Sequence, residues 1–131
     1  MGPKRQATVI VAENDLVMRK VLLIALEVSG YRAMPALDGL EAISLVEEAE
    51  APKLLLTGLP LSGLVGLALA KHAIGTGVPV VLYASKPGRV AEAAARSLGV
   101  HRLLDKDQLS IEVLAEAMHA AAYAAGMPTD G

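Results

Sequence analysis

The stretch Thr8–Ala12, which reads T-V-I-V-A, is a nearly continuous apolar run. A strand that is apolar on both alternating faces is typical of a parallel sheet that is covered on both sides. The segment that follows, Asp15–Ser29, has apolar residues at helical spacing, namely Val17, Val21, Leu22, Ile24 and Val28. Gly30 is a residue type that commonly ends a helix. The chain is therefore predicted to open with a buried strand and a helix.

The same alternation continues to the end of the chain. Four more strands are predicted at Arg32–Ala36, Lys53–Gly58, Val78–Ala84 and His101–Leu104. Four more helices are predicted from the Asp38 and Glu41 capping box to about Glu50, near Leu64–Ile74, from Pro87 to Gly99, and from about Gln108 to Ala125 with Asp107 as its cap. The apolar stripe of the last helix is Leu109, Val113, Leu114, Ala117, Met118 and Ala121.

Strands that alternate with helices predict an α/β fold with a doubly wound parallel sheet. Pro35 lacks a backbone donor, which places its strand at an edge of the sheet. Five strands with the second at an edge fit the flavodoxin-like order 2-1-3-4-5. We expect a single domain over residues 1–131 with a core from about 8 to 125.

Composition excludes several functions. The 131 residues include no cysteine, which excludes disulfides and thiol chemistry. A net charge of -2, with three Tyr and no Trp or Phe, argues against a nucleic-acid partner. The uncharged stretch Leu54–Ala70 contains Pro60 and several glycines, so no membrane partner is expected. We find no targeting signal, and a cytoplasmic location is expected.

Five segments in order are similar to those of one family. V-I-V-A-E-N-D-L-V-M-R-K-V-L (9–22) resembles its first strand and acidic pair, and G-Y-R-A (30–33) with D-G-L-E-A-I (38–43) its second strand and helix. P-K-L-L-L-T-G-L-P-L-S-G-L-V-G-L (52–67), V-P-V-V-L-Y-A-S (78–85) and G-V-H-R-L-L-D-K (99–106) resemble the remaining strands. From roughly Thr8 to Ala122, the sequence resembles the receiver domain of bacterial two-component response regulators.

This resemblance implies phosphoryl transfer from a phosphohistidine to an aspartate after the third strand. Two acids after the first strand would help to hold Mg²⁺, while a Ser or Thr and a Lys would contact the phosphoryl oxygens. The matching positions here form a vestigial pocket of Glu13, Asn14, Gly58, Ala84 and Lys106. Only the lysine is kept in full, and the family's aromatic switch position falls on Leu103.

The missing acceptor does not depend on the alignment, because no Asp or Glu occurs from Ala51 to Val90. Thr57 is adjacent to Gly58, but strand alternation points its side chain to the other face. The resemblance therefore implies a degenerate receiver without the phosphoacceptor aspartate. No catalytic residue, enzymatic activity or cofactor is expected.

Several of these residues have an ordinary structural role as the alternative to a functional one. Glu13 is a weak metal candidate, Mg²⁺ binding is expected to be weak or absent, and an ion pair between Glu13 and Lys106 is favoured. Asn14 and Asp15 are expected to cap the first helix. The three histidines show no metal-site spacing.

Partner-binding candidates fall into two groups. An apolar loop after the third strand carries Leu59, Leu61, Leu64 and Val65. The face built by the fourth helix, the last strand and the last helix carries Leu103, His119 and Tyr123. The small-residue segment A-E-A-A-A-R-S (91–97) leaves a homodimer open.

Three functions remain open. The favoured one is a stand-alone, phosphorylation-independent protein-interaction module in bacterial signalling. Its partner would be a histidine kinase, a phosphotransfer protein or another regulator. The alternatives are a phosphorelay receiver with an unorthodox acceptor and a small-molecule-binding sensor.

Overall fold

The five predicted strands form one parallel sheet in the order β2-β1-β3-β4-β5, as expected. This arrangement comes from a computed structural model that describes residues 7–59 and 64–127. The strands are β1 (Thr8–Ala12), β2 (Arg32–Ala36), β3 (Lys53–Gly58), β4 (Val80–Ala84) and β5 (Arg102–Asp105). The bounds of the first three are as predicted, and Pro35 lies on the edge strand β2 opposite Val11.

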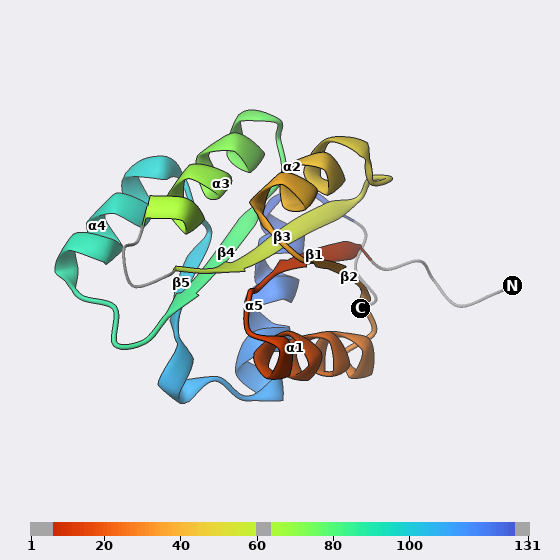
Figure 1. The fold of residues 1–131 in the computed structure, drawn as a ribbon, viewed down its shortest axis with the longest axis horizontal. Coiled ribbons are helices and arrows are strands. Elements are labelled where there is room, and N and C mark those ends of the chain that lie inside the picture. Colours follow the sequence, from red (N-terminus) through yellow and green to blue (C-terminus); the bar gives the residue numbers. More distant parts are fainter. Residues whose placement is uncertain (1–6, 60–63, 128–131) are drawn as a thin grey trace, which may run out of the picture.

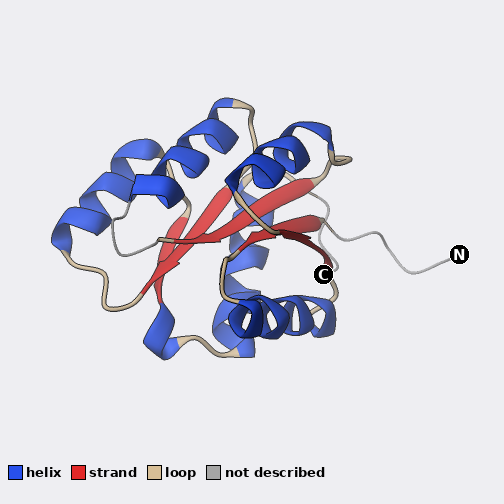
Figure 2. Ribbon diagram, in the orientation of Figure 1, coloured by secondary structure: helices blue, strands red, loops and turns tan. Residues whose placement is uncertain are grey.

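Helices cover both faces of the sheet (Figures 1 and 2). They are α1 (Leu16–Val28), α2 (Gly39–Glu48), α3 (Leu64–Gly75), α4 (Arg89–Leu98), α5 (Ile111–Ala124) and a single 3₁₀ turn, η1 (Lys106–Gln108). α1 and α5 pack together on one face, whereas α2, α3 and α4 form the other layer. None of these helices, within the described ranges, is both long and apolar enough to cross a membrane.

Side-chain alternation along the strands builds two apolar cores, one on each face of the sheet. The core beneath α1 and α5 includes Val9, Val11, Leu54, Leu56, Val81, Tyr83, Leu22, Leu26, Leu114 and Met118. The core beneath α2 and α3 includes Ile10, Leu55, Val80, Leu82, Val46, Leu69, Ala70 and Ala73. Both cores run up to the carboxyl edge of the sheet, where they form the floor of any site built there.

Two of the predicted helix starts are confirmed by their caps. The Asp15 carboxylate accepts the backbone N–H of Val17 at 2.8 Å and of Met18 at 3.0 Å. Asn14 is exposed and makes no cap bond in the described part of the chain, so only Asp15 has the capping role. Asp38 caps α2 by accepting the Glu41 N–H at 2.8 Å.

The predicted starts of α4 and α5 are wrong. α5 begins at Ile111, and Ser110 caps it by accepting the Val113 N–H at 3.0 Å. Asp107 instead lies within the η1 turn, because the preceding Asp105 side chain accepts its N–H and bends the chain early. Pro87 lies outside α4, which begins at Arg89 after Gly88.

The apolar residues predicted for α1 do not all face the core. Leu22 faces the core together with Ala25 and Leu26. The other four members of the predicted set are exposed and lie about 120° around the helix axis from the buried residues; they are Val17, Val21, Ile24 and Val28, named here the outer stripe. α1 is thus apolar on two faces, and the sheet covers only one of them. In α5 the predicted stripe is buried at Leu114, Ala117, Met118 and Ala121, whereas Val113 is exposed.

Candidate functional site

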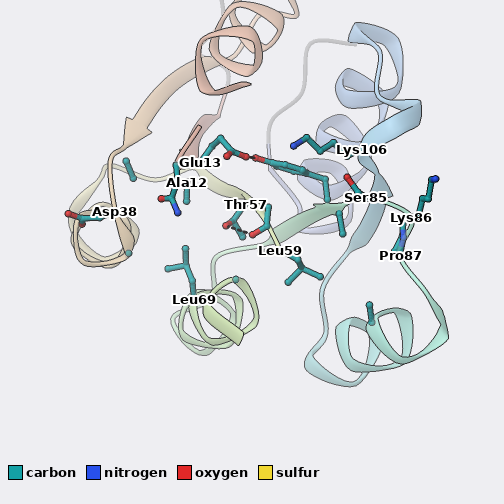
Figure 3. A pocket seen from close by; sticks show the side chains of 18 of the residues that line it. Ala12, Glu13, Asp38, Thr57, Leu59, Leu69, Ser85, Lys86, Pro87 and Lys106 are labelled. Atoms are coloured by element: carbon teal, nitrogen blue, oxygen red, sulfur yellow. Dashed lines mark hydrogen bonds between the residues drawn. The ribbon is translucent and has the colours of Figure 1, made fainter. Parts of the chain in front are cut away.

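The carboxyl ends of β1, β3 and β4 surround a cavity of about 560 Å³ (Figure 3). All five residues of the predicted vestigial pocket line it, namely Glu13, Asn14, Gly58, Ala84 and Lys106. They come together because parallel strands end at one edge of the sheet. The sequence therefore predicted that these five residues lie together, but it did not reveal which side chain fills the space between them.

Tyr83 occupies the space above Gly58. The two residues are paired in the β3–β4 register. A Cβ atom on Gly58 would lie 3.0 Å from Cζ of Tyr83 and 2.8 Å from its Cε1, and the second distance is shorter than real Cβ contacts. Tyr83 is 2% exposed, so its ring is fixed by packing. The position that would carry the family's aspartate is therefore a glycine covered by an aromatic ring.

The hydroxyl of Tyr83 donates a hydrogen bond to Oε1 of Glu13. The second carboxylate oxygen, Oε2, accepts the backbone N–H of Asp15 at 2.9 Å. Burial of the ring, the bond to Glu13, and the negative charges of Glu13 and Asp15 raise the pKa of Tyr83 far above its ordinary value. Tyr83 is thus a protonated donor, and both Glu13 oxygens have partners within the chain.

Tyr83 was missed from the sequence, where it was counted only as part of a strand. The signal that would have found it is its place beside Gly58 across two adjacent strands. A glycine leaves room for a large side chain on the neighbouring strand. Pairing the residues of the two neighbouring strands, rather than taking each strand by itself, would have placed the ring of Tyr83 in the cavity.

The expected ion pair between Glu13 and Lys106 is wrong for the described residues. The Glu13 oxygens face the Tyr83 hydroxyl and the Asp15 N–H instead. Lys106 opens the η1 turn at the rim of the cavity and is exposed. The N–H groups of Met18 and Val17 lower the pKa of Asp15, and the charges of Lys106 and Arg19 lower it further.

The residues present do not fit the Mg²⁺ ion that the family resemblance implies. Mg²⁺ requires near-octahedral oxygen coordination, usually with one or two carboxylates. Glu13 has both oxygens engaged, and neither Gly58 nor Asn14 supplies a carboxylate. Within residues 7–59 and 64–127, no three histidine or acidic side chains gather in a way that could hold a metal.

Thr57 also lines the cavity, but its hydroxyl is engaged within the chain. It is 3% exposed, and its hydroxyl donates to the carbonyl of Gly58 at 3.2 Å. It shares a face with Leu55, in agreement with the predicted alternation. A Cβ on Gly66 would lie 2.6 Å from that same carbonyl oxygen. α3 therefore rests directly on the end of β3.

The loop after β4 is fastened to the end of β5. Lys86 has a positive φ of 47°, which is uncommon for a residue other than glycine. Its backbone N–H donates to Oδ1 of Asp105 at 3.3 Å, and the same oxygen accepts the Asp107 N–H at 2.9 Å. Asp105, the last residue of β5, thus positions one wall of the cavity.

The predicted partner-binding residues lie in different environments. Leu59 and Leu103 are half-buried and pack against the core beneath α2 and α3. Leu61 lies outside the described residues, and Leu64 and Val65 belong to α3 with side chains outside the description. His119 and Tyr123 are exposed on α5 and line a shallow hollow beside Tyr31. Only this last pair forms a described surface feature.

Comparisons with known proteins agree on the architecture. No protein-family model and no curated protein sequence matches the chain. Among solved structures, the Vibrio cholerae chemotaxis protein CheY4 has a TM-score of 0.77 and 17% identity over 88% of this chain and 98% of that one. A response regulator receiver domain protein from Clostridium thermocellum has a TM-score of 0.80 and 16% identity over 91% and 96%.

A third neighbour has the same fold within a different parent protein. The signal receiver domain of an HD domain-containing protein from Pseudomonas fluorescens Pf-5 has a TM-score of 0.79 and 21% identity, covering 93% of this chain and 98% of its own. At these identities the likeness concerns the arrangement of the backbone. The chain has the flavodoxin-like, CheY-like fold of response regulator receiver domains.

Proposed function

We propose that this protein is an atypical receiver domain that acts as a phosphorylation-independent protein-interaction module in bacterial two-component signalling. The observation that carries the proposal is the covered Gly58: it supplies no carboxylate, and the ring of Tyr83 fills the space above it. The partner would be a histidine kinase, a phosphotransfer protein or another regulator.

Phosphoryl transfer to a receiver needs a carboxylate nucleophile and stabilisation of the developing negative charge. The sequence holds no Asp or Glu from Ala51 to Val90, so the ends of β3 and β4 offer no carboxylate acceptor. The nearest carboxylate, Glu13, is engaged by Tyr83 and by the Asp15 N–H. A non-enzymatic, unphosphorylated role agrees with all three observations.

A fixed resting conformation follows from the same contacts. A bound group shifts a conformational equilibrium only through contacts that differ between the two states. Here Ala84 stands where the family has a Ser or Thr, and Leu103 stands where it has an aromatic switch residue. The side chains that couple the family's site to its outer face are therefore absent. Recognition then depends on surface residues, of which His119 and Tyr123 are the described candidates.

Phosphorylation is tested by intact-mass measurement after incubation with acetyl phosphate and Mg²⁺. The wild-type mass is expected to stay unchanged. The triple variant Gly58→Asp, Tyr83→Leu and Asn14→Asp restores the acceptor and the acidic pair while making room for them. Its matched control carries Gly58→Asn in place of Gly58→Asp. A phosphoryl group on a specific wild-type residue would refute the proposal.

The interaction role is tested with the partner recovered from the native host. Tyr123→Ala and His119→Ala are expected to weaken binding, whereas Lys106→Ala leaves it unchanged. If Lys106→Ala alone abolishes binding in a folded protein, the cavity itself is functional and a fixed outer surface is wrong.

A second candidate is a sensor for a small anion. The cavity lies within the size range of small-molecule sites, and no carboxylate of the described residues pairs with Lys106 at its rim. A panel of small anions would be screened for a rise in melting temperature. A rise that is lost in Lys106→Met but kept in Lys71→Met would favour this candidate.

A further inference from the structure

The outer stripe of α1 is an apolar surface that no described residue covers. Val17 is 71% exposed, Val21 54%, Ile24 63% and Val28 69%. Their spacing of four, three and four residues places them in one row along the helix. α1 lies at the periphery of the molecule, next to α5 and away from α2, α3 and α4 (Figures 1 and 2).

Exposing this apolar row to water is energetically unfavourable. Solvent-facing helix positions are normally polar, and β-branched residues are weaker helix formers than Ala, Lys or Glu. The helix does not need the row for folding, because Leu22, Ala25 and Leu26 already anchor its inner face. Contiguous exposed apolar side chains of this kind mark an interaction surface.

Two charges beside the stripe indicate what covers it. Lys20 and Glu27 are exposed on the same flank, two turns of helix apart. Among the described residues neither belongs to a salt bridge, and Glu27 accepts only the Ala33 N–H at 3.3 Å. The flank is therefore positive toward the start of the helix and negative toward its end.

Such a surface is complementary to a reversed copy of itself. When two α1 helices pack antiparallel about a two-fold axis between Val21 and Ile24, the two stripes face each other. The same axis sets Lys20 of each copy opposite Glu27 of the other, which gives two matched charge pairs. A parallel two-fold pairing would instead place the Lys20 and Glu27 flanks of the two copies on opposite sides of the contact, so that these charge pairs would not form.

We propose that the chain forms a two-fold symmetric homodimer through antiparallel packing of α1, with the outer stripe at its centre. The surface is separate from the cavity at Gly58, so a failure here leaves the proposed function untouched. The state of the cavity likewise does not alter the expected dimer.

The first test is the oligomeric state, measured by sedimentation equilibrium over a concentration series. The wild type is expected to move from monomer to dimer with rising concentration. Val21→Gln and Ile24→Gln remove central contacts and are expected to raise the dissociation constant about tenfold or more each. Val90→Gln changes an equally aliphatic side chain, 85% exposed on α4, and is expected to have no effect.

The second test uses charge reversal. Lys20→Glu and Glu27→Lys are each expected to weaken self-association, because each places like charges opposite one another. The double variant is expected to restore it, and the two single variants mixed together are expected to form a heterodimer. Lys71→Glu, on the exposed surface of α3, is the matched control.

Three results would overturn the inference. One is a wild type that stays monomeric at all accessible concentrations. Another is a dimer that is insensitive to the stripe substitutions, which would place the contact elsewhere, for instance on the small-residue segment of α4. The third is single charge variants that do not pair when mixed. Circular dichroism on each variant checks that the fold is retained.

Discussion

At the carboxyl edge of the sheet, side chains that depart from the receiver pattern contact one another: the Tyr83 ring covers Gly58 and its hydroxyl binds Glu13. On the outer stripe of α1, by contrast, Val17, Val21, Ile24 and Val28 find no partner among the described residues. The first region is complete within one chain, whereas the second is not. The covered pocket therefore indicates which chemistry is lost, whereas the uncovered stripe indicates a surface that a second molecule can cover.

The largest effect is expected when the ring that fills the carboxyl edge of the sheet is removed. Tyr83→Ala removes a ring that is 2% exposed and is expected to lower the free energy of unfolding by about 3–5 kcal/mol. Urea unfolding followed by circular dichroism measures it. A loss much smaller than this range would mean that the ring does not fill the space above Gly58.

Two leucine-sized residues on the same helix sharpen the contrast between covered and uncovered surfaces. Leu26→Ala, on the inner face of α1, is expected to cost about 2–5 kcal/mol of unfolding free energy. Ile24→Ala, on the outer stripe, is expected to change it by no more than about 0.5 kcal/mol. Both are measured at low protein concentration, where the monomer dominates. Equal losses would contradict the exposure of the outer stripe.

The close approach of Gly58 and Tyr83 predicts a smaller, conditional effect. Gly58→Ala overpacks the site and is expected to cost about 1–3 kcal/mol of unfolding free energy. In a Tyr83→Leu background the same substitution is expected to be nearly neutral, because the ring it meets is gone. A double-mutant cycle measures this coupling, and additive costs would show that the two sites are independent.

Alkaline pH gives the mildest test. The pKa of Tyr83 is raised by folding, so its stabilising effect is fully present below its unfolded value of about 10 and is lost as pH rises above that. Wild-type unfolding free energy is expected to fall by up to ~1.4 kcal/mol more per pH unit above about 10 than that of Tyr83→Phe. Tyr31, whose pKa burial also raises, is common to both proteins and cancels.

The sequence predicted the sheet well because strand composition and Pro35 restrict the topology to few solutions. The bounds of β1, β2 and β3 and the strand order were all confirmed. Helix starts were less certain because several capping residues lie close together: Asp105, Asp107 and Ser110 all precede α5, and only local hydrogen bonding decides among them.

Side-chain direction was the main source of error. Periodicity identified α1 as a helix but could not tell its inner face from its outer one, because both are apolar. The vestigial pocket was located from the order of the strands, yet its filling depends on the pairing of Gly58 with Tyr83 across two strands. Contacts of this kind depend on which residues are paired between neighbouring strands. The apolar pattern within one segment does not show that pairing.

The contact between Gly58 and Tyr83 also restricts the order in which substitutions can accumulate. An aspartate at position 58 meets the ring unless position 83 has changed first, and a small residue at position 83 opens a void unless position 58 has changed first. Each single step lowers stability before the second restores it. An acidic acceptor at this site is thus separated from the present sequence by an intermediate of lower stability, whichever of the two positions changes first.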